Sequence, residues 1–110
     1  MVLPIVLVVY WSAMTIGTHL PPGPKTDDLS LDKPIHFGAF FGLSVLLGGV
    51  LWQRRKPLWI VVPVLLTYAA IDEVSQIPVG READPYDWLC DFAGTVCGVL
   101  VLNRVLPREP

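Results

Sequence analysis

Four long apolar segments fill most of this 110-residue chain, and short polar stretches separate them. A helix needs about 20 predominantly apolar residues to cross the hydrocarbon core of a bilayer, so segments of this length predict membrane-spanning helices. The composition agrees, because 53% of the residues are hydrophobic and the mean hydropathy is +0.55. We therefore expect an all-α, polytopic membrane protein. Residues 1–110 would form a single domain, a bundle of four transmembrane helices.

The segments between the expected spans contain residues that end helices or favour water. The run Pro21–Pro24 closes the first span, and the basic run Arg54–Lys56 follows the second. The first span lacks the basic start and the small-residue cleavage site of a signal peptide. We expect it to be retained as a packing and anchoring helix that carries almost no polar chemistry. The expected spans are Val2–Thr18, Pro34–Trp52, Leu58–Ile77 and Tyr86–Leu106.

Basic residues predict the orientation of the bundle. The compact cluster Arg54–Lys56 lies between the second and third spans, and Arg104 and Arg108 lie at the C-terminal end. Cytoplasmic loops of membrane proteins carry an excess of Lys and Arg. We therefore expect a multi-pass protein of the cytoplasmic (inner) membrane with both termini in the cytoplasm, an N-in and C-in arrangement. The loops over residues 19–33 and 78–86 would face outward.

Polar and ionisable residues interrupt three of the expected spans near the ends that would face outward. A charge in the hydrocarbon core costs a few kcal/mol or more, so such residues usually face the bundle interior and usually have a function. Because all three groups lie at one depth, they predict one polar, acidic site on the extracytoplasmic side. The residues are Lys33, His36, Asp72, Glu73, Gln76, Asp87 and Asp91.

The fourth span combines its carboxylates with small residues. On a helical wheel, Asp87, Asp91, Gly94 and Gly98 fall within about 60° of one another. The two glycines form a G-x-x-x-G motif, which lets a second helix approach closely. This contact would hold both carboxylates against a neighbouring helix instead of lipid. In the second span, three glycines mark a face that differs from that of His36 and can pack another helix: Gly38, Gly42 and Gly49.

Each polar residue also has a purely structural interpretation. Asp32 and Lys33 can be an interfacial helix start with an acid that favours the helix dipole. Asp87 can be an N-cap or first-turn acid, and His36 can be an interfacial histidine. This interpretation is weakest for Glu73 and Asp91, which lie a turn or more inside apolar helices. A buried acid there needs a charged partner, a metal ion or a proton. An ion-pair network that only stabilises packing remains an open alternative.

The order of four short motifs resembles the VanZ-like family of small bacterial membrane proteins. They are D-K-x-x-H-F from Asp32, E-x-x-Q from Glu73, G-R-x-x-D-x-x-D from Gly80, and a polar residue, Asp91, before G-x-x-x-G. The resemblance extends over residues 31–100, although relatives often carry Asn where this chain has Asp91. It implies an integral protein of the cell envelope. The founding member of the family is associated with low-level resistance to the antibiotic teicoplanin, a lipid-tailed glycopeptide.

We expect the site to act on or bind a lipid-linked envelope precursor or a lipoglycopeptide within the lipid membrane. The candidate catalytic residues would supply acid–base groups or ligands for a divalent cation. The candidate substrate-binding residues would make polar contacts with the head group of the ligand. No serine or cysteine stands beside a base at a recognisable spacing, so acyl transfer is not favoured. The candidate catalytic residues are His36, Glu73, Asp87 and Asp91; the candidate substrate-binding residues are Asp32, Lys33, Gln76, Arg81 and Asp84.

Whether the chain is an enzyme stays open at this point. The alternatives are a non-catalytic binding protein, a structural protein whose charges form a packing network, and a small transporter subunit. The last is disfavoured because four short spans without inverted repeats would need to oligomerise. The net charge of −2 gives no basis for binding nucleic acid.

Overall fold

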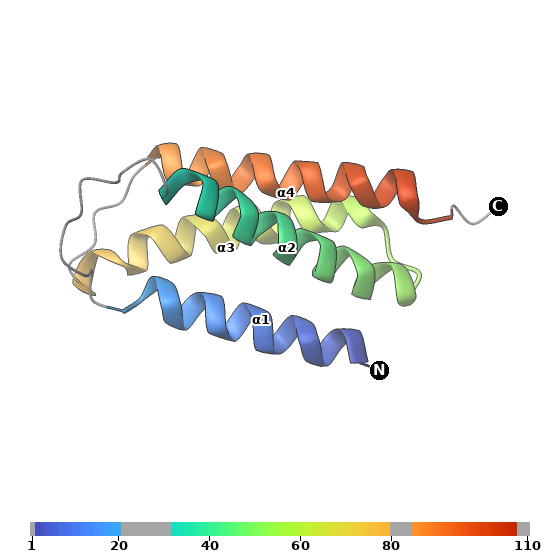
Figure 1. Cartoon of the computed structure of the whole chain (residues 1–110), viewed down its shortest axis with the longest axis horizontal. Helices are drawn as coiled ribbons and strands as arrows, with labels where there is room; N and C mark the ends of the chain where they lie inside the picture. Colours follow the sequence, from blue (N-terminus) through green and yellow to red (C-terminus); the bar gives the residue numbers. More distant parts are fainter. Residues whose placement is uncertain (1, 21–31, 80–84, 108–110) are drawn as a thin grey trace.

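The computed structural model describes residues 2–20, 32–79 and 85–107, and in these residues it contains helices and no strand. Four α-helices run antiparallel to their neighbours in the chain, so that the start of α1 and the end of α4 lie at the same end of the bundle (Figure 1). The all-α prediction is confirmed. The elements are α1 Val2–Thr18, α2 Asp32–Gln53, η2 Leu58–Ile60, α3 Val61–Ser75, η3 Ile77–Val79 and α4 Pro85–Val105.

Three helical segments are long and apolar enough to cross a membrane: Lys33–Gln53, Leu58–Ser75 and Pro85–Val105. They match the second, third and fourth expected spans to within a few residues. The first expected span agrees with α1 residue for residue, but its 17 residues are fewer than the other three contain. At 1.5 Å per residue, α1 is about 25 Å long, against a hydrocarbon core of about 30 Å.

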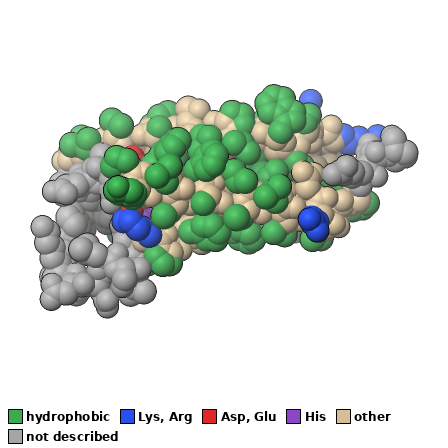
Figure 2. Space-filling model, turned by 90° about the horizontal axis from the view of Figure 1, so that it is seen from above, with side chains coloured by type: hydrophobic (Ala, Val, Ile, Leu, Met, Phe, Trp, Pro, Cys, Tyr) green, Lys and Arg blue, Asp and Glu red, His purple; other side chains and the backbone are tan. Residues whose placement is uncertain are grey.

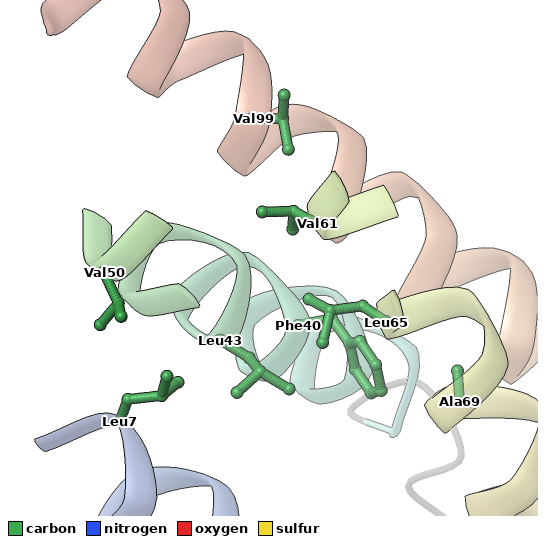
Figure 3. Close-up of a cluster of buried hydrophobic side chains, with 8 residues drawn as sticks. All are labelled: Leu7, Phe40, Leu43, Val50, Val61, Leu65, Ala69 and Val99. Carbon is green, nitrogen blue, oxygen red and sulfur yellow. The ribbon is translucent and has the colours of Figure 1, made fainter. Parts of the chain in front are cut away.

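The interior of the bundle is apolar along most of its length. A cluster of buried side chains joins all four helices around α2 (Figure 3). Large hydrophobic side chains also cover the outside, and on the face in Figure 2 the coloured charged side chains lie near the two ends. Such an outer surface is suited to lipid rather than water. The buried cluster comprises Leu7, Phe40, Leu43, Val50, Val61, Leu65, Ala69 and Val99.

Helices α2 and α4 make the closest contact in the bundle. A Cβ atom added at Gly94 would collide with the backbone carbonyl of Phe37, and one added at Gly98 would lie 2.6 Å from the Ser44 hydroxyl oxygen. The Ser44 hydroxyl donates a hydrogen bond of 2.8 Å to the carbonyl oxygen of Thr95. The predicted role of the G-x-x-x-G motif is therefore confirmed, and its partner is α2.

Two of the three glycines expected to form a packing face on α2 do contact another helix. Gly42 faces the Tyr10 ring of α1, and Gly49 faces Leu3 of the same helix, so this side of α2 does pack a second helix. The expectation was wrong for Gly38, which has no neighbouring atom within 4 Å of an added Cβ. The Tyr10 hydroxyl donates a hydrogen bond of 2.7 Å to the carbonyl oxygen of Ala39, which fixes α1 against α2.

Candidate functional site

The polar residues gather at the end of the bundle opposite the two termini, where α2 and α4 begin and α3 ends (Figure 1). They are buried although they are polar or ionisable: Asp91 is 1% exposed and Glu73 is 6% exposed. Each of these residues lies near the end of its helix at this end of the bundle. Because neighbouring helices are antiparallel, residues distant in the sequence lie at one depth along the bundle axis. The buried polar side chains here are Asp72, Glu73, Gln76, Asp87 and Asp91.

His36 of α2 is the central side chain of the first group. Its Nδ1 atom lies 2.8 Å from Oδ1 of Asp91 on α4, so the two side chains share a short hydrogen bond. Glu73 of α3 completes the group. His36, Glu73 and Asp91 each offer one nitrogen or oxygen atom, and these three atoms lie within 4.8 Å of one another. Three helices thus place three potential metal ligands together.

The second nitrogen of the same imidazole faces a different acid. His36 Nε2 lies 3.7 Å from Oδ2 of Asp87, and Lys33 Nζ lies 3.4 Å from the other oxygen of that carboxylate. The Asp87 side chain is buried, whereas that of Lys33 is 44% exposed. Asp87 therefore sits between a lysine at the surface and a histidine in the interior.

Asp72 is the centre of a second polar group, on the side of α3 that faces α1. Thr18 donates a hydrogen bond of 2.9 Å to its Oδ1, and Gln76 donates one of 2.8 Å to its Oδ2. About one turn before Thr18 in α1, the hydroxyl group of Thr15 lies 2.6 Å from that of Tyr68 in α3. These bonds join α1 to α3 beside the first group.

The expectation that the first span carries almost no polar chemistry was wrong, because Tyr10, Thr15 and Thr18 of α1 make hydrogen bonds to α2 and α3. His19, just after α1, has its Nε2 atom 2.7 Å from the hydroxyl oxygen of Ser75 and its Nδ1 atom 3.6 Å from Asp72. A serine therefore does stand beside a base, through a contact between residues 56 positions apart that spacing in the sequence does not reveal.

The Ser75–His19 contact has the geometry of a helix end rather than of a catalytic triad. His19 Nδ1 lies 2.9 Å from the carbonyl oxygen of Thr15, closer than it lies to Asp72. The Ser75 hydroxyl also lies 3.0 Å from the carbonyl oxygen of Asp72 in its own helix. Carbonyl groups in the last turn of a helix lack intrahelical partners, and the His19 imidazole lies within hydrogen-bond distance of such a carbonyl, that of Thr15. The Asp72 carbonyl accepts a hydrogen bond from the backbone N–H of Gln76 as well as from Ser75.

The structure brings together most of the candidate residues named from the sequence. Lys33, His36, Glu73, Asp87 and Asp91 form the first group, and Gln76 joins the second by binding Asp72. Arg81, Asp84 and the side chain of Asp32 lie outside the described part of the chain. The sequence reasoning missed Thr18, His19 and Tyr68. Thr18 and His19 could have been found from the sequence, because they form a polar end on an otherwise apolar first span.

A groove beside the first group leads from the polar end into apolar surroundings. It lies between α1 and α2, has a volume of about 260 Å³, and His36 forms part of its wall. Apart from His36 and Thr18, the residues around it are apolar or glycine. They are Met14, Gly17, Ile35, Ala39 and Phe40.

The polar groups are internally satisfied. Among the described residues, every buried side-chain nitrogen or oxygen atom has a hydrogen-bond partner. Buried polar groups without partners cost free energy, so this end of the bundle can fold without a bound ligand. The arrangement offers an imidazole, several carboxylates and an ammonium group for binding ions or polar head groups, or for transferring protons.

Comparison with known proteins agrees with the motif order. A family model described as VanZ/LLP1 matches residues 5–106, nearly the whole chain. No curated protein and no solved structure matches the chain. With a match of this extent, and with apolar helices long enough to cross a membrane, the chain is a membrane protein that belongs to the VanZ/LLP1 family.

Proposed function

We propose that this protein belongs to the bacterial cell envelope and binds the polar head of a lipid-linked envelope precursor or a lipoglycopeptide. The observation that carries the proposal is the position of His36, which bonds the buried Asp91 and also forms part of the wall of an apolar groove. A lipid-tailed ligand has the same two parts. Its chain would lie in the groove, and its head would reach the polar group.

The charges of the site fit such a head group. Lys33 is partly exposed and can bind a phosphate or carboxylate, while the buried carboxylates can accept hydrogen bonds from hydroxyl or amine groups. Arg81 and Asp84 remain candidates for the same head group. Teicoplanin combines a fatty acyl tail with a polar glycopeptide, so resistance of this type is one role that the site would serve.

The proposed sidedness follows from the basic residues. Arg54, Arg55 and Lys56 lie at the end of the bundle opposite the polar site. If this basic end faces the cytoplasm, the site opens on the extracytoplasmic side of the inner membrane. A site on that side would be accessible to lipid-linked precursors and to lipoglycopeptides.

A catalytic role is the second candidate, and the His36–Asp91 pair favours it. An imidazole held by a carboxylate is a common general base, and Asp87 faces the other nitrogen of the same ring. The reaction would be proton transfer to or from a lipid-linked substrate. A nucleophilic serine is not part of this candidate.

Binding can be measured with the full chain in lipid nanodiscs, using teicoplanin and undecaprenyl phosphate as probes. Microscale thermophoresis should give saturable binding of at least one probe to the wild-type chain. His36→Gln should weaken it by about tenfold or more, since a hydrogen bond to a charged group contributes about 1.5–3 kcal/mol. Gln53→Glu, at the opposite end of the bundle, is the control and should leave the affinity unchanged.

Two results would count against binding at this site. One is the absence of saturable binding of either probe to folded wild-type protein, and the other is an equal loss of affinity in His36→Gln and Gln53→Glu. Glu73→Gln separates the two candidates. A binding protein should change only its affinity, whereas an enzyme should lose turnover of undecaprenyl phosphate or teicoplanin and keep binding it.

A further inference from the structure

We propose that His36, Glu73 and Asp91 bind one divalent transition-metal ion. The three residues come from α2, α3 and α4, and their ligand atoms lie within 4.8 Å of one another. Asp91 is almost fully buried and Glu73 nearly so. The metal site concerns these three side chains alone, and it stands whether or not a lipid-linked molecule binds the groove.

The donor set selects the kind of ion. One imidazole nitrogen with two carboxylates is a ligand set that suits Zn²⁺ and Mn²⁺, whereas Mg²⁺ and Ca²⁺ prefer oxygen ligands throughout. Zn²⁺ stands above Mn²⁺ in the general order of affinities for such sites. We therefore expect Zn²⁺ to bind most tightly, then Mn²⁺, with Mg²⁺ and Ca²⁺ far weaker.

The His36–Asp91 pair needs only a small adjustment to admit the ion, whereas the Glu73 carboxylate, whose oxygen lies within 4.8 Å of both partners, would move toward them. His36 Nδ1 and Asp91 Oδ1 are 2.8 Å apart, which is the separation of two atoms that share a proton. Two ligands of a tetrahedral Zn²⁺ at about 2.0–2.1 Å lie roughly 3.3 Å apart. An opening of about half an ångström would let the ion replace the proton, which would leave for solvent.

A second observation, independent of the ligand cluster, supports the site. Histidines that bind metals almost always direct their other ring nitrogen to a carboxylate or carbonyl, which fixes the ring. His36 is placed to do this, because its Nε2 faces Oδ2 of Asp87 at 3.7 Å, slightly beyond hydrogen-bond distance, while its Nδ1 faces Asp91. Lys33 in turn lies 3.4 Å from Asp87. The structure therefore contains both the ligands and the outer carboxylate of a histidine–metal site.

The test uses the full-length chain in phosphatidylcholine nanodiscs, after removal of any polyhistidine tag. Isothermal titration with Zn²⁺ should give one ion per chain. Asp91→Asn keeps the size of the side chain and should weaken binding by about a hundredfold or more, and Asp87→Asn by about 10–100-fold. Asp72→Asn is the matched control, because it changes a buried acid at the same depth that belongs to the other group. Asp72→Asn should change the Zn²⁺ affinity by less than about threefold, because Asp72 is neither a metal ligand nor a partner of His36.

Three outcomes would overturn the metal site. They are no binding of Zn²⁺ or Mn²⁺ to folded wild-type protein, unchanged binding in Asp91→Asn, and an equal loss in Asp91→Asn and Asp72→Asn. X-ray absorption spectroscopy of Zn²⁺ bound to the wild-type chain reports the ligand atoms directly. This measurement does not depend on whether the variants fold. The chain has two histidines, and we expect one imidazole in the zinc shell. A shell with two imidazoles or with oxygen atoms alone would contradict the proposal.

Discussion

At the scale of single residues, the direction of each side chain separates two neighbouring acids into different roles. Asp72 and Glu73 are adjacent in α3, so their side chains point about 100° apart around the helix. Asp72 faces α1 and accepts hydrogen bonds from Thr18 and Gln76. Glu73 faces the group formed with His36 and Asp91. The first acid therefore joins helices, and the second belongs to the candidate site.

The contact between Ser75 and His19 should be structural. We expect Ser75→Ala to lower the free energy of unfolding by about 0.5–1.5 kcal/mol, since it removes the exposed hydrogen bond to His19 and the partly buried one to the Asp72 carbonyl, and to leave ligand affinity within twofold. Ser12→Ala, at an exposed position of α1, is the control and should change neither quantity. Thermal unfolding in detergent measures the first quantity. Loss of turnover of a bound probe without loss of stability would instead identify Ser75 as a nucleophile.

At the scale of helices, the contact between α2 and α4 sets the geometry of the site. Gly94 lies one turn after Asp91 and touches the backbone of Phe37, which lies beside His36. The His36–Asp91 bond therefore depends on how closely these two helices approach. α1 has a different role, because the hydrogen bonds of Tyr10, Thr18 and His19 attach a shorter apolar helix to the bundle.

Two glycine substitutions should separate close packing from helix propensity. Gly94→Ala should destabilise the bundle by about 1–3 kcal/mol, because the added Cβ meets backbone rather than a flexible side chain. Gly38→Ala should be neutral or should stabilise the bundle by up to about 1 kcal/mol, because the added Cβ meets no atom within 4 Å. Thermal unfolding of both variants in the same detergent is the measurement. Equal effects would show that helix propensity dominates at both positions.

At the scale of the whole molecule, the sequence was sufficient for the helices and for the position of the polar end. Apolar segment length predicted all four helices, and the G-x-x-x-G motif predicted a close helix contact. Periodicity gives the face of a residue but not the helix that it meets. For this reason the pairing of Asp72 with Thr18 and the contribution of His19 could not be predicted. They depend on how α1 packs against α3.

The orientation of the molecule remains a prediction from its basic residues, and cysteine labelling can test it. In a background with Cys90 and Cys97 replaced by alanine, Thr26→Cys should react with a membrane-impermeant maleimide in intact cells. Arg55→Cys should react only after lysis, because we expect its loop in the cytoplasm. The reverse pattern would place the polar site on the cytoplasmic side and would contradict the proposed ligands.

The central claim is that the polar end of the bundle and the neighbouring groove form one ligand site. An experimental structure of the full chain in nanodiscs with undecaprenyl phosphate tests this most directly. We expect the phosphate within hydrogen-bonding distance of His36 or Lys33, and the hydrocarbon chain between α1 and α2 beside Phe40. Phosphate bound at the opposite end, beside Arg55 and Lys56, would contradict the claim, as would a groove that remains empty at saturating ligand.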